Sequence, residues 1–321
     1  MFASMSIKTR FSHFFYIILV YIIIFIVSFN INYYIVFDFN FSLILRLFSL
    51  LIFNFFSFMT LITHLKSMFT NPGFVPFNFT FNDFDISKEN FSLLSKKYNL
   101  YCNKCKIFRP FRAHHCKICN RCVLKMDHHC FWIFNCVGYY NQKNFYQFLF
   151  YATFGDLIAF VILIFVCFEI DFDIEKNVNE KINNVFQLIF QMGKQINIII
   201  AILCSFTMFF SVGFLWLKHT KMIMKNQTTI EKKIYSNWKK SLFFVDNKLL
   251  CFKSVMGKNL YDFFSLKFYD YYGILMKNQI EILKKNENNN KIEITTIDLN
   301  NKNNNKKVIN KNIYEKLDES Y

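Results

Sequence analysis

The chain has 321 residues and a formal net charge of +16, and 54% of its residues are hydrophobic and 20% aromatic, 45 of them Phe. This composition excludes an ordinary soluble domain. The basic excess has two candidate explanations: the charge asymmetry of a membrane protein whose basic loops face anionic lipid headgroups, and recognition of a phosphorylated substrate.

A short N-terminal segment, residues 1–13, precedes two apolar runs within residues 14–63. Residues 14–37 carry no formal charge, and residues 41–63 carry only Arg46, near one end. At a rise of about 1.5 Å per residue, such a run crosses the roughly 30 Å hydrocarbon core of a bilayer. We therefore expect transmembrane helices 1 and 2 here. The alternative, helices buried in a soluble core, would require apolar residues to be covered on every face.

Residues 64–144 contain a dense group of cysteines and histidines. Seven of the ten cysteines and four of the seven histidines lie between Cys102 and Cys136. Two tetrahedral zinc ions, each bound by three Cys and one His, need six Cys and two His, and such sites commonly use Cys-x-x-Cys turns. The count predicts two structural zincs and leaves one thiol over.

The remaining thiol is best placed at Cys130, which directly follows Asp127, His128 and His129. Side chains two residues apart in extended backbone share a face, so His128 is expected beside Cys130 while His129 faces a zinc. Asp127 can then hold His128 in the tautomer that accepts the thiol proton. The alternative makes all four residues structural ligands and leaves no nucleophile.

Transmembrane helices 3 and 4 are expected within residues 145–217. Residues 195–217 are uncharged, and Asp156 is the one charged residue of 145–168. An acidic loop, residues 169–194, separates the two helices. A C-terminal region, residues 218–283, and an Asn- and Lys-rich disordered tail, residues 284–321, follow. The expected fold class is an all-α polytopic membrane protein with four transmembrane helices and a Cys-rich domain.

The distribution of charge predicts the topology. Four spans place both termini on one side, and basic residues are enriched in the cytosolic segments of membrane proteins. Lys8 and Arg10 precede the first span, and basic residues outnumber acids in 64–144, whereas 169–194 is acidic. We expect both termini and the Cys-rich domain in the cytosol and the acidic loop in the lumen. Cytosolic thiols stay reduced, which favours metal binding or catalysis over disulfides.

A long spaced pattern resembles the Cys-rich domain of the DHHC protein S-acyltransferases, or palmitoyltransferases, without a gap. It reads Cys102-x2-Cys105-x3-Arg109-Pro110-x-Arg112-x2-His115-Cys116-x2-Cys119-x2-Cys122-x4-Asp127-His128-His129-Cys130-x-Trp132-Ile133-x-Asn135-Cys136-Val137-Gly138-x2-Asn141-x3-Phe145. Two flanking segments add to the resemblance, because Thr70-Asn71-Pro72-Gly73 is similar to the family's Asp-Pro-Gly turn and Thr228-Thr229-Ile230-Glu231 to its Thr-Thr-x-Glu motif. Asn71 in place of Asp, and Phe131 in place of Pro, depart from the pattern.

The resemblance implies specific roles for the matched residues. Cys130 is implied as the thiol that takes the acyl group, His128 as its base and Asp127 as the group that orients His128. One zinc is implied to bind Cys102, Cys105, His115 and Cys122, and the other Cys116, Cys119, His129 and Cys136. Thr228, Thr229, Glu231 and Asn141 are implied as supporting motif residues.

The implied reaction moves a fatty acyl group from acyl-CoA, palmitoyl-CoA first of all, to Cys130 and then to cytosolic cysteines of membrane-associated proteins. Arg109 and Arg112 are candidates for the CoA phosphates because guanidinium groups form fork-like contacts with phosphate, and Trp132 is a further candidate substrate contact. Lys104, Lys106 and Lys117 are weaker candidates. The expected location is a multi-pass endomembrane protein of Golgi or ER, with the plasma membrane as the alternative.

Two other classes of function compete with this interpretation. A zinc-stabilised membrane adaptor or RING-like ligase would use every metal residue structurally, but the Cys-x-His step of RING ligands is missing from the pattern. A zinc-finger nucleic-acid binder fits the basic charge but not four membrane spans, so we expect no nucleic-acid partner.

Overall fold

The computed structural model describes residues 7–37, 42–78, 100–178, 185–235, 245–257 and 259–265. The expected tail, 284–321, lies outside these residues. The described residues form two compact units. One, the helical unit, comprises residues 12–68 and 144–219; the other, the Cys-rich unit, takes its described residues from 7–11, from 69–143 and from 220 onward.

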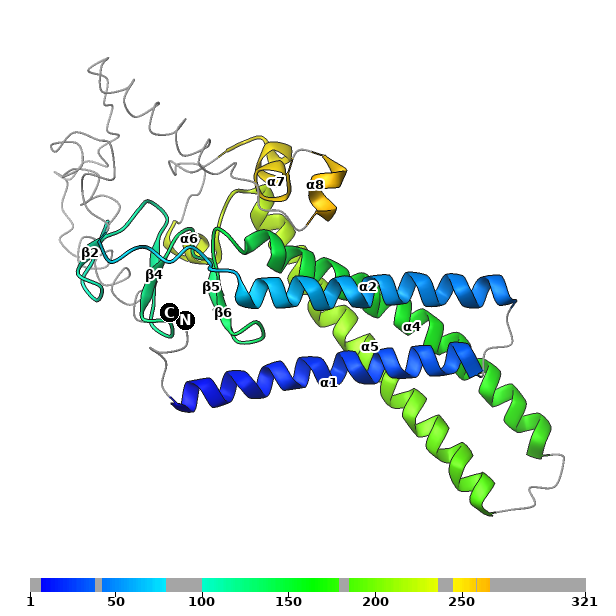
Figure 1. Cartoon of the computed structure of the whole chain (residues 1–321). Helices are drawn as coiled ribbons and strands as arrows, with labels where there is room; N and C mark the ends of the chain where they lie inside the picture. The colour runs from blue at the N-terminus through cyan, green and yellow to red at the C-terminus, as the bar shows by residue number, and fades with distance from the viewer. Residues whose placement is uncertain are drawn as a thin grey trace, which may run out of the picture. The chain divides into compact units, whose positions relative to one another are not determined.

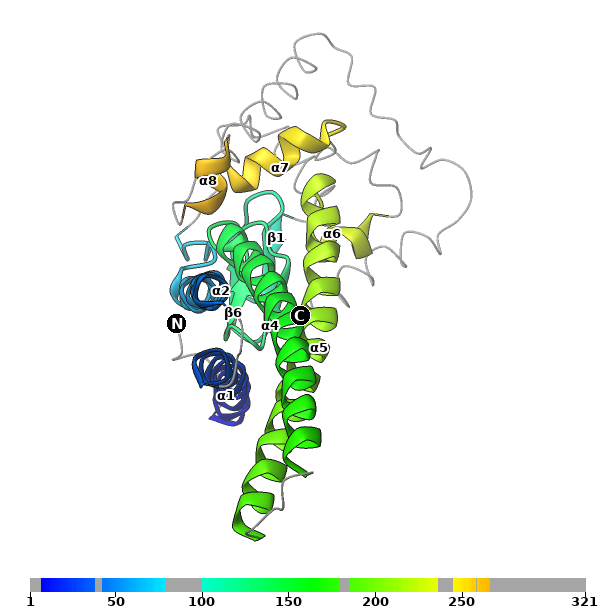
Figure 2. The same cartoon turned by 90° about the vertical axis from the view of Figure 1, so that its right-hand side faces the viewer.

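The helical unit is formed by four long helices: α1 (Ile7–Phe37), α2 (Leu43–Phe69), α4 (Gln142–Val178) and α5 (Val185–Met224). Each contains a stretch long and apolar enough to cross a bilayer, at Phe14–Val36, Leu43–Phe69, Gln142–Phe168 and Met192–Met224. These four candidate spans confirm the number expected from the sequence. In Figures 1 and 2, α1 lies beside α2 and α4 beside α5.

The helices are longer than the apolar runs that predict them. α4 continues to Val178 and α5 begins at Val185, so much of the expected loop 169–194 is helical. Charged residues end an apolar run without ending a helix, because Glu and Lys are good helix formers and the backbone hydrogen bonds do not depend on hydropathy. The hydropathy pattern therefore marked the bilayer-compatible length and not the helix ends.

An apolar core and a few polar pairs join the four helices. The core includes Ile31 of α1, Phe53 of α2, Leu163 of α4 and Ile198 of α5, among others. Polar side chains also meet between helices: Asn197 Nδ2 donates to Asn30 Oδ1 at 2.7 Å, Asn54 Nδ2 to Asn32 Oδ1 at 2.8 Å, and Tyr21 Oη lies 3.1 Å from His64 Nδ1. Such pairs satisfy polar groups for which lipid offers no partner.

The Cys-rich unit contains three short antiparallel hairpins. They are β1 (Tyr101–Cys102) with β2 (Ile107–Phe108), β3 (His114–Cys116) with β4 (Arg121–Val123), and β5 (His128–Cys130) with β6 (Asn135–Val137). Strands of two or three residues are too short to be stable by pairing alone. Other contacts in the Cys-rich unit must therefore stabilise the three hairpins.

One extended segment before the hairpins is attached to β4. Asn71 Oδ1 accepts the N–H groups of Gly73 and Phe74 at 2.9 and 3.0 Å, so Asn forms the turn that Asp forms in the family pattern. The segment then runs along β4, where Leu124 N–H donates to Gly73 O at 2.8 Å and Val75 N–H to Cys122 O at 2.9 Å. This places the turn after α2 against the metal-ligand hairpin.

Three short helices complete the described part of the Cys-rich unit: α6 (Thr229–Ile234), α7 (Lys248–Met256) and α8 (Leu260–Phe264). Asn259 caps α8 and Asp262 returns the bond in a capping box. The buried Lys143 Nζ donates to Asp262 O at 2.6 Å. This contact anchors the C-terminal segment around Asp262 to the start of α4 within the Cys-rich unit's sequence.

Candidate active site and metal centres

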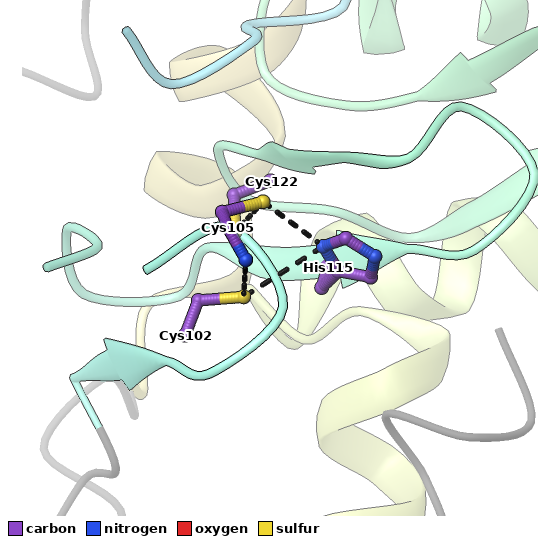
Figure 3. A group of neighbouring side chains, drawn as sticks. All are labelled: Cys102, Cys105, His115 and Cys122. Atoms are coloured by element: carbon purple, nitrogen blue, oxygen red, sulfur yellow. Dashed lines mark hydrogen bonds between the residues drawn. The ribbon is translucent and has the colours of Figure 1, made fainter. Parts of the chain in front are cut away.

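Two groups of side chains have the geometry of tetrahedral metal sites. Cys102, Cys105, His115 and Cys122 form the first, and Cys116, Cys119, His129 and Cys136 the second, with the ligand atoms of each group within 4.8 Å of one another. Figure 3 shows the first group converging from two hairpins on one point. These are the two ligand sets that the family resemblance implies.

The separations between ligand atoms are close to those of a tetrahedral metal site. Zn–S and Zn–N bonds of about 2.3 and 2.1 Å in a tetrahedron place ligand atoms about 3.5 to 3.8 Å apart. In the second group, His129 Nδ1 lies 3.6 Å from Cys116 Sγ and 3.4 Å from both Cys119 Sγ and Cys136 Sγ. In the first group, His115 Nδ1 lies 3.7 Å from Cys102 Sγ and 3.2 Å from Cys105 Sγ. Both groups can hold a metal ion, and an ion at each would join the three hairpins.

The three hairpins repeat one design at a 14-residue interval. In each, a Cys at the end of the first strand pairs with the first residue of the second strand: Cys102 with Ile107, Cys116 with Arg121, and Cys130 with Asn135. Each turn also has one residue with positive φ at the same position, at Lys106, Asn120 and Phe134.

The third hairpin lacks the second thiol of this design. Cys105 and Cys119 each donate a backbone N–H to the thiol three residues earlier, at 3.4 Å in both hairpins, as in a Cys-x-x-Cys knuckle. The equivalent residue of the third hairpin is Ile133, which is fully buried. Cys130 therefore occupies a metal-ligand position of the repeat but belongs to neither metal group.

Asp127 and His128 lie next to this thiol. His128 Nδ1 lies 2.6 Å from Asp127 Oδ2, and His128 also hydrogen-bonds to the side chain of Cys130. Burial alone would lower the pKa of His128, but its hydrogen bonds to Asp127 and Cys130 and their negative charges raise that pKa to about 10. A protonated His128 stabilises negative charge on the neighbouring sulfur. His129 points instead to the second metal group, as the alternation of side chains predicts.

Residues from beyond the fourth span hold Asp127 in place. Thr229 donates its backbone N–H to Asp127 Oδ1 at 2.7 Å and its hydroxyl to Asp127 Oδ2 at 2.9 Å. Thr229 is the first residue of α6, whose N-cap Thr228 forms a capping box with Glu231. The Thr-Thr-x-Glu segment thus presents a helix N-terminus to a buried carboxylate, where the helix dipole favours negative charge.

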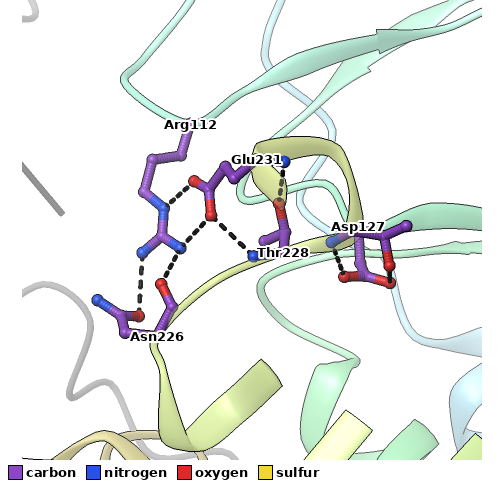
Figure 4. Close-up of polar contacts among 6 residues, drawn as sticks. Arg112, Asp127, Asn226, Thr228 and Glu231 are labelled. Carbon is purple, nitrogen blue, oxygen red and sulfur yellow. Dashed lines mark hydrogen bonds and ion pairs between the residues drawn. The ribbon is translucent and has the colours of Figure 1, made fainter. Parts of the chain in front are cut away.

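Arg112 was expected from the sequence to be available to a CoA phosphate, but the structure pairs it with residues of the protein. Its side chain is buried, and its guanidinium contacts Glu231 and Asn226 (Figure 4). A contact with a CoA phosphate would require this buried ion pair to break, so we revise that expectation. Arg109 is buried as well, whereas Trp132 is 41% exposed in the turn that follows Cys130.

A second buried cation lies close to this ion pair. Burial lowers the pKa of Lys125 to about 7; the charge of Arg112 adds to this effect, and the charges of Glu231 and Asp127 oppose it. Arg112 and Lys125 are thus two buried basic side chains within the electrostatic influence of the buried carboxylates Glu231 and Asp127. Glu231 is the carboxylate that faces Arg112.

Asn141 connects the third hairpin to α4. Its Oδ1 accepts the Gly138 N–H at 2.9 Å, and its Nδ2 donates to Cys136 O at 2.8 Å. Gly138 is required here, because a Cβ would lie 2.4 Å from Pro72 O and 2.6 Å from Val123 Cγ1. Asn141 thus fixes the strand that carries the metal ligand Cys136.

Comparison with known proteins matches this part of the chain to one family. The model of the DHHC palmitoyltransferase family covers residues 95–236. Residues 95–236 are thus similar to the DHHC palmitoyltransferase family. The match includes the three hairpins, both metal groups and the Thr-Thr-x-Glu segment.

Individual relatives align with parts of the chain. Probable protein S-acyltransferase 15 of Arabidopsis thaliana is 42% identical over 99 residues, which are 31% of this chain and 38% of the relative. Human palmitoyltransferase ZDHHC3 is 40% identical over 124 residues, 38% of this chain and 40% of that protein. Palmitoyltransferase PFA3 of Debaryomyces hansenii is 37% identical over 131 residues, 41% of this chain and 29% of that protein. The chain thus spans about two fifths or less of the length of these relatives.

Some contacts of the DHHC domain were not foreseen from the sequence. Asn226 was not singled out, although it accepts two hydrogen bonds from Arg112, and nothing in its local sequence marks it. Lys143 was counted only among the basic residues of 64–144, and its buried hydrogen bond to Asp262 was not expected. Both residues bond to partners more than a hundred residues away.

Proposed function

We propose that this protein is an S-acyltransferase that transfers a fatty acyl group from acyl-CoA, through a thioester on Cys130, to cysteine thiols of membrane-associated proteins. The observation that carries the proposal is the third hairpin. In this hairpin, Cys130 stands where the other hairpins have a metal-ligand thiol, but it belongs to neither metal group. It lies instead beside the Asp127–His128 pair. Palmitoyl-CoA is the donor we expect first, in line with the family description.

The first half-reaction forms the Cys130 thioester. The Cys130 sulfur attacks the carbonyl carbon of the acyl-CoA thioester after His128 takes the thiol proton, and the bond between this carbon and the CoA sulfur breaks. His128 returns the proton to the departing CoA thiol. Asp127 stabilises His128 while His128 holds the proton, as the orienting carboxylate does in related triads.

The second half-reaction reverses these roles with a new acceptor. A substrate cysteine loses its proton to His128 and attacks the acyl carbon, and the bond to Cys130 sulfur breaks. One thioester replaces another in each step, so no cofactor or energy source is consumed. The task of the site is to activate a thiol and hold it beside its base.

Two zinc ions are proposed for the Cys/His groups, and their contribution is structural. Four-coordinate sites with all positions filled by protein offer no open position for substrate. Their residues hold the hairpins together, and His129 of the second group fixes the strand on which His128 and Cys130 lie. Arg109 remains a candidate for contact with the CoA phosphates, and Trp132 remains a candidate for contact with the substrate.

The membrane setting of the proposal follows the charge distribution. Both termini and the DHHC domain are proposed to be cytosolic, where acyl-CoA is available, with the 169–194 segment on the lumenal side. The four apolar helices support a multi-pass protein. Golgi or ER membranes are the proposed location.

Acyl loading of Cys130 tests the proposal. Purified protein given palmitoyl-CoA should acquire one hydroxylamine-labile acyl group, located on Cys130 by mass spectrometry. Cys130→Ser should lose this acyl group and keep its zinc, whereas an adaptor would keep both its zinc and its activity after the same change. Equal labelling of Cys130→Ser at another single cysteine would contradict the assignment.

A further inference from the structure

The guanidinium of Arg112 makes four hydrogen bonds within the protein. Its Nε donates to Glu231 Oε1, and its Nη2 donates to Glu231 Oε2 at 2.8 Å. Asn226 takes two more bonds, from Nη1 to its side-chain Oδ1 at 3.1 Å and from Nη2 to its backbone O at 2.8 Å. The two side chains of the ion pair are 1% and 3% exposed. A Lys could not replace Arg112 here, because an ammonium group cannot make the two parallel hydrogen bonds that a guanidinium makes with one carboxylate.

Glu231 uses the same carboxylate for a second purpose. Its Oε2 accepts the backbone N–H of Thr228 at 2.8 Å, and its own N–H donates to Thr228 Oγ1 at 3.2 Å. These are the two bonds of the capping box that begins α6. Arg112 therefore orients the carboxylate that closes the first turn of this helix (Figure 4).

The helix that begins at this cap cannot hold its own geometry. α6 has six residues, and a helix of that length is not stable in isolation. Asn226, with φ of +48°, forms the turn between α5 and α6, and both of its oxygens face Arg112. Arg112 thus fixes this connection on both sides: Asn226 before the cap and Glu231 after it.

The first residue of α6 is the one that holds the proposed triad. Thr229 binds both oxygens of Asp127, and Asp127 binds His128. Hydrogen bonds therefore connect Arg112 to Glu231 and Glu231 to Thr228, and the next residue, Thr229, bonds to Asp127. We propose that Arg112 is a positioning residue for the catalytic triad, which acts through Glu231 and Asn226 to keep Thr229 against Asp127.

This inference rests on the proposed acyltransferase function and makes a distinct kinetic prediction. A positioning residue affects the rate of the chemical step, whereas a residue that binds CoA phosphate affects the acyl-CoA concentration needed for half-maximal loading. Arg112→Lys keeps the charge and loses the fork, and Glu231→Gln keeps the size and loses the charge. Each should lower the maximal rate of Cys130 loading at least ten-fold and leave the half-saturating palmitoyl-CoA concentration within two-fold of wild type.

A double-mutant comparison adds a readout that a general structural role would not give. Because the effect passes through Thr229, Arg112→Lys should slow loading much less in a Thr229→Val background than in wild type. The matched control is Lys232→Gln, which removes one exposed positive charge from α6 outside this set of bonds and should load at the wild-type rate.

The outcomes separate the two proposals. Absence of acyl-Cys130 in the wild-type protein would refute the proposed function itself. If wild type loads normally, three results would each overturn the positioning role: variants that load at the wild-type rate, a raised half-saturating concentration with an unchanged maximal rate, or full additivity with Thr229→Val. Loss of zinc from both Arg112→Lys and Glu231→Gln would also overturn it, because Arg112 would then maintain the domain fold as a whole.

Discussion

Replacing Thr229 by Val removes a hydroxyl that donates to Asp127 and also lies 3.8 Å from Met222 Sδ. Val has nearly the shape of Thr, and the backbone N–H of residue 229 still reaches Asp127 Oδ1 at 2.7 Å. The lost bond is the hydroxyl donor to Asp127 Oδ2, at 2.9 Å. After the change, His128 Nδ1 still lies 2.6 Å from that oxygen.

The expected size of the effect follows from the charge and burial of Asp127. This carboxylate is 1% exposed. A hydrogen bond to a buried charged group contributes about 1.5–3 kcal/mol, and each 1.36 kcal/mol of lost transition-state stabilisation slows a reaction about ten-fold. If Asp127 must be held in place to stabilise protonated His128, Thr229→Val should load Cys130 about 10- to 100-fold more slowly.

The assay is a quenched time course of hydroxylamine-labile palmitate on Cys130 at saturating palmitoyl-CoA. Thr229→Ser is the matched control, because it restores the hydroxyl without the methyl group and should stay within a few-fold of wild type. Zinc content should be the same in both variants. Wild-type loading by Thr229→Val, or equal slowing by Thr229→Ser, would refute the argument that the hydroxyl positions Asp127.

Three further predictions concern metal, packing and topology. Elemental analysis should find close to two zincs per chain in wild type and in Cys130→Ser, and fewer in Cys102→Ala; zinc loss from Cys130→Ser would show that Cys130 is a ligand. Gly138→Ala places a methyl group 2.4 Å from a backbone oxygen and should destabilise the Cys-rich unit by about 2–3 kcal/mol, seen as faster zinc release to a chelator, with unchanged release contradicting the packing argument. In sealed vesicles with the cytosolic face outward, added protease should remove a tag near Lys96 and spare one near Asn179; protection of the first tag would separate the site from cytosolic acyl-CoA.

The features that sequence predicts here are those that composition and short spacing impose. A bilayer requires about 20 apolar residues in a row, so the four candidate spans could be recognised without any tertiary contact. A tetrahedral metal site requires a fixed set of ligand types at short spacings, and this made the Cys/His groups and the extra thiol of Cys130 recognisable. The alternation of side chains along a strand separated His128 from His129 correctly.

The helix ends were not predictable in the same way. Apolar runs marked the bilayer-compatible length, but α4 and α5 continue into charged sequence that is equally compatible with helix. Their bounds depend on where backbone hydrogen bonding stops, which hydropathy does not encode.

Tertiary structure alone decided what holds the triad. Thr229 and Asp127 are 102 residues apart in sequence, and Arg112 and Glu231 are 119 residues apart. Local sequence shows that Arg112 is a fork-shaped cation suited to a phosphate or a carboxylate, but not which of the two it meets. The fold places Glu231 beside Arg112 and excludes water from the pair. A buried charge without a partner is strongly unfavourable, so the position of Glu231 determines what Arg112 binds.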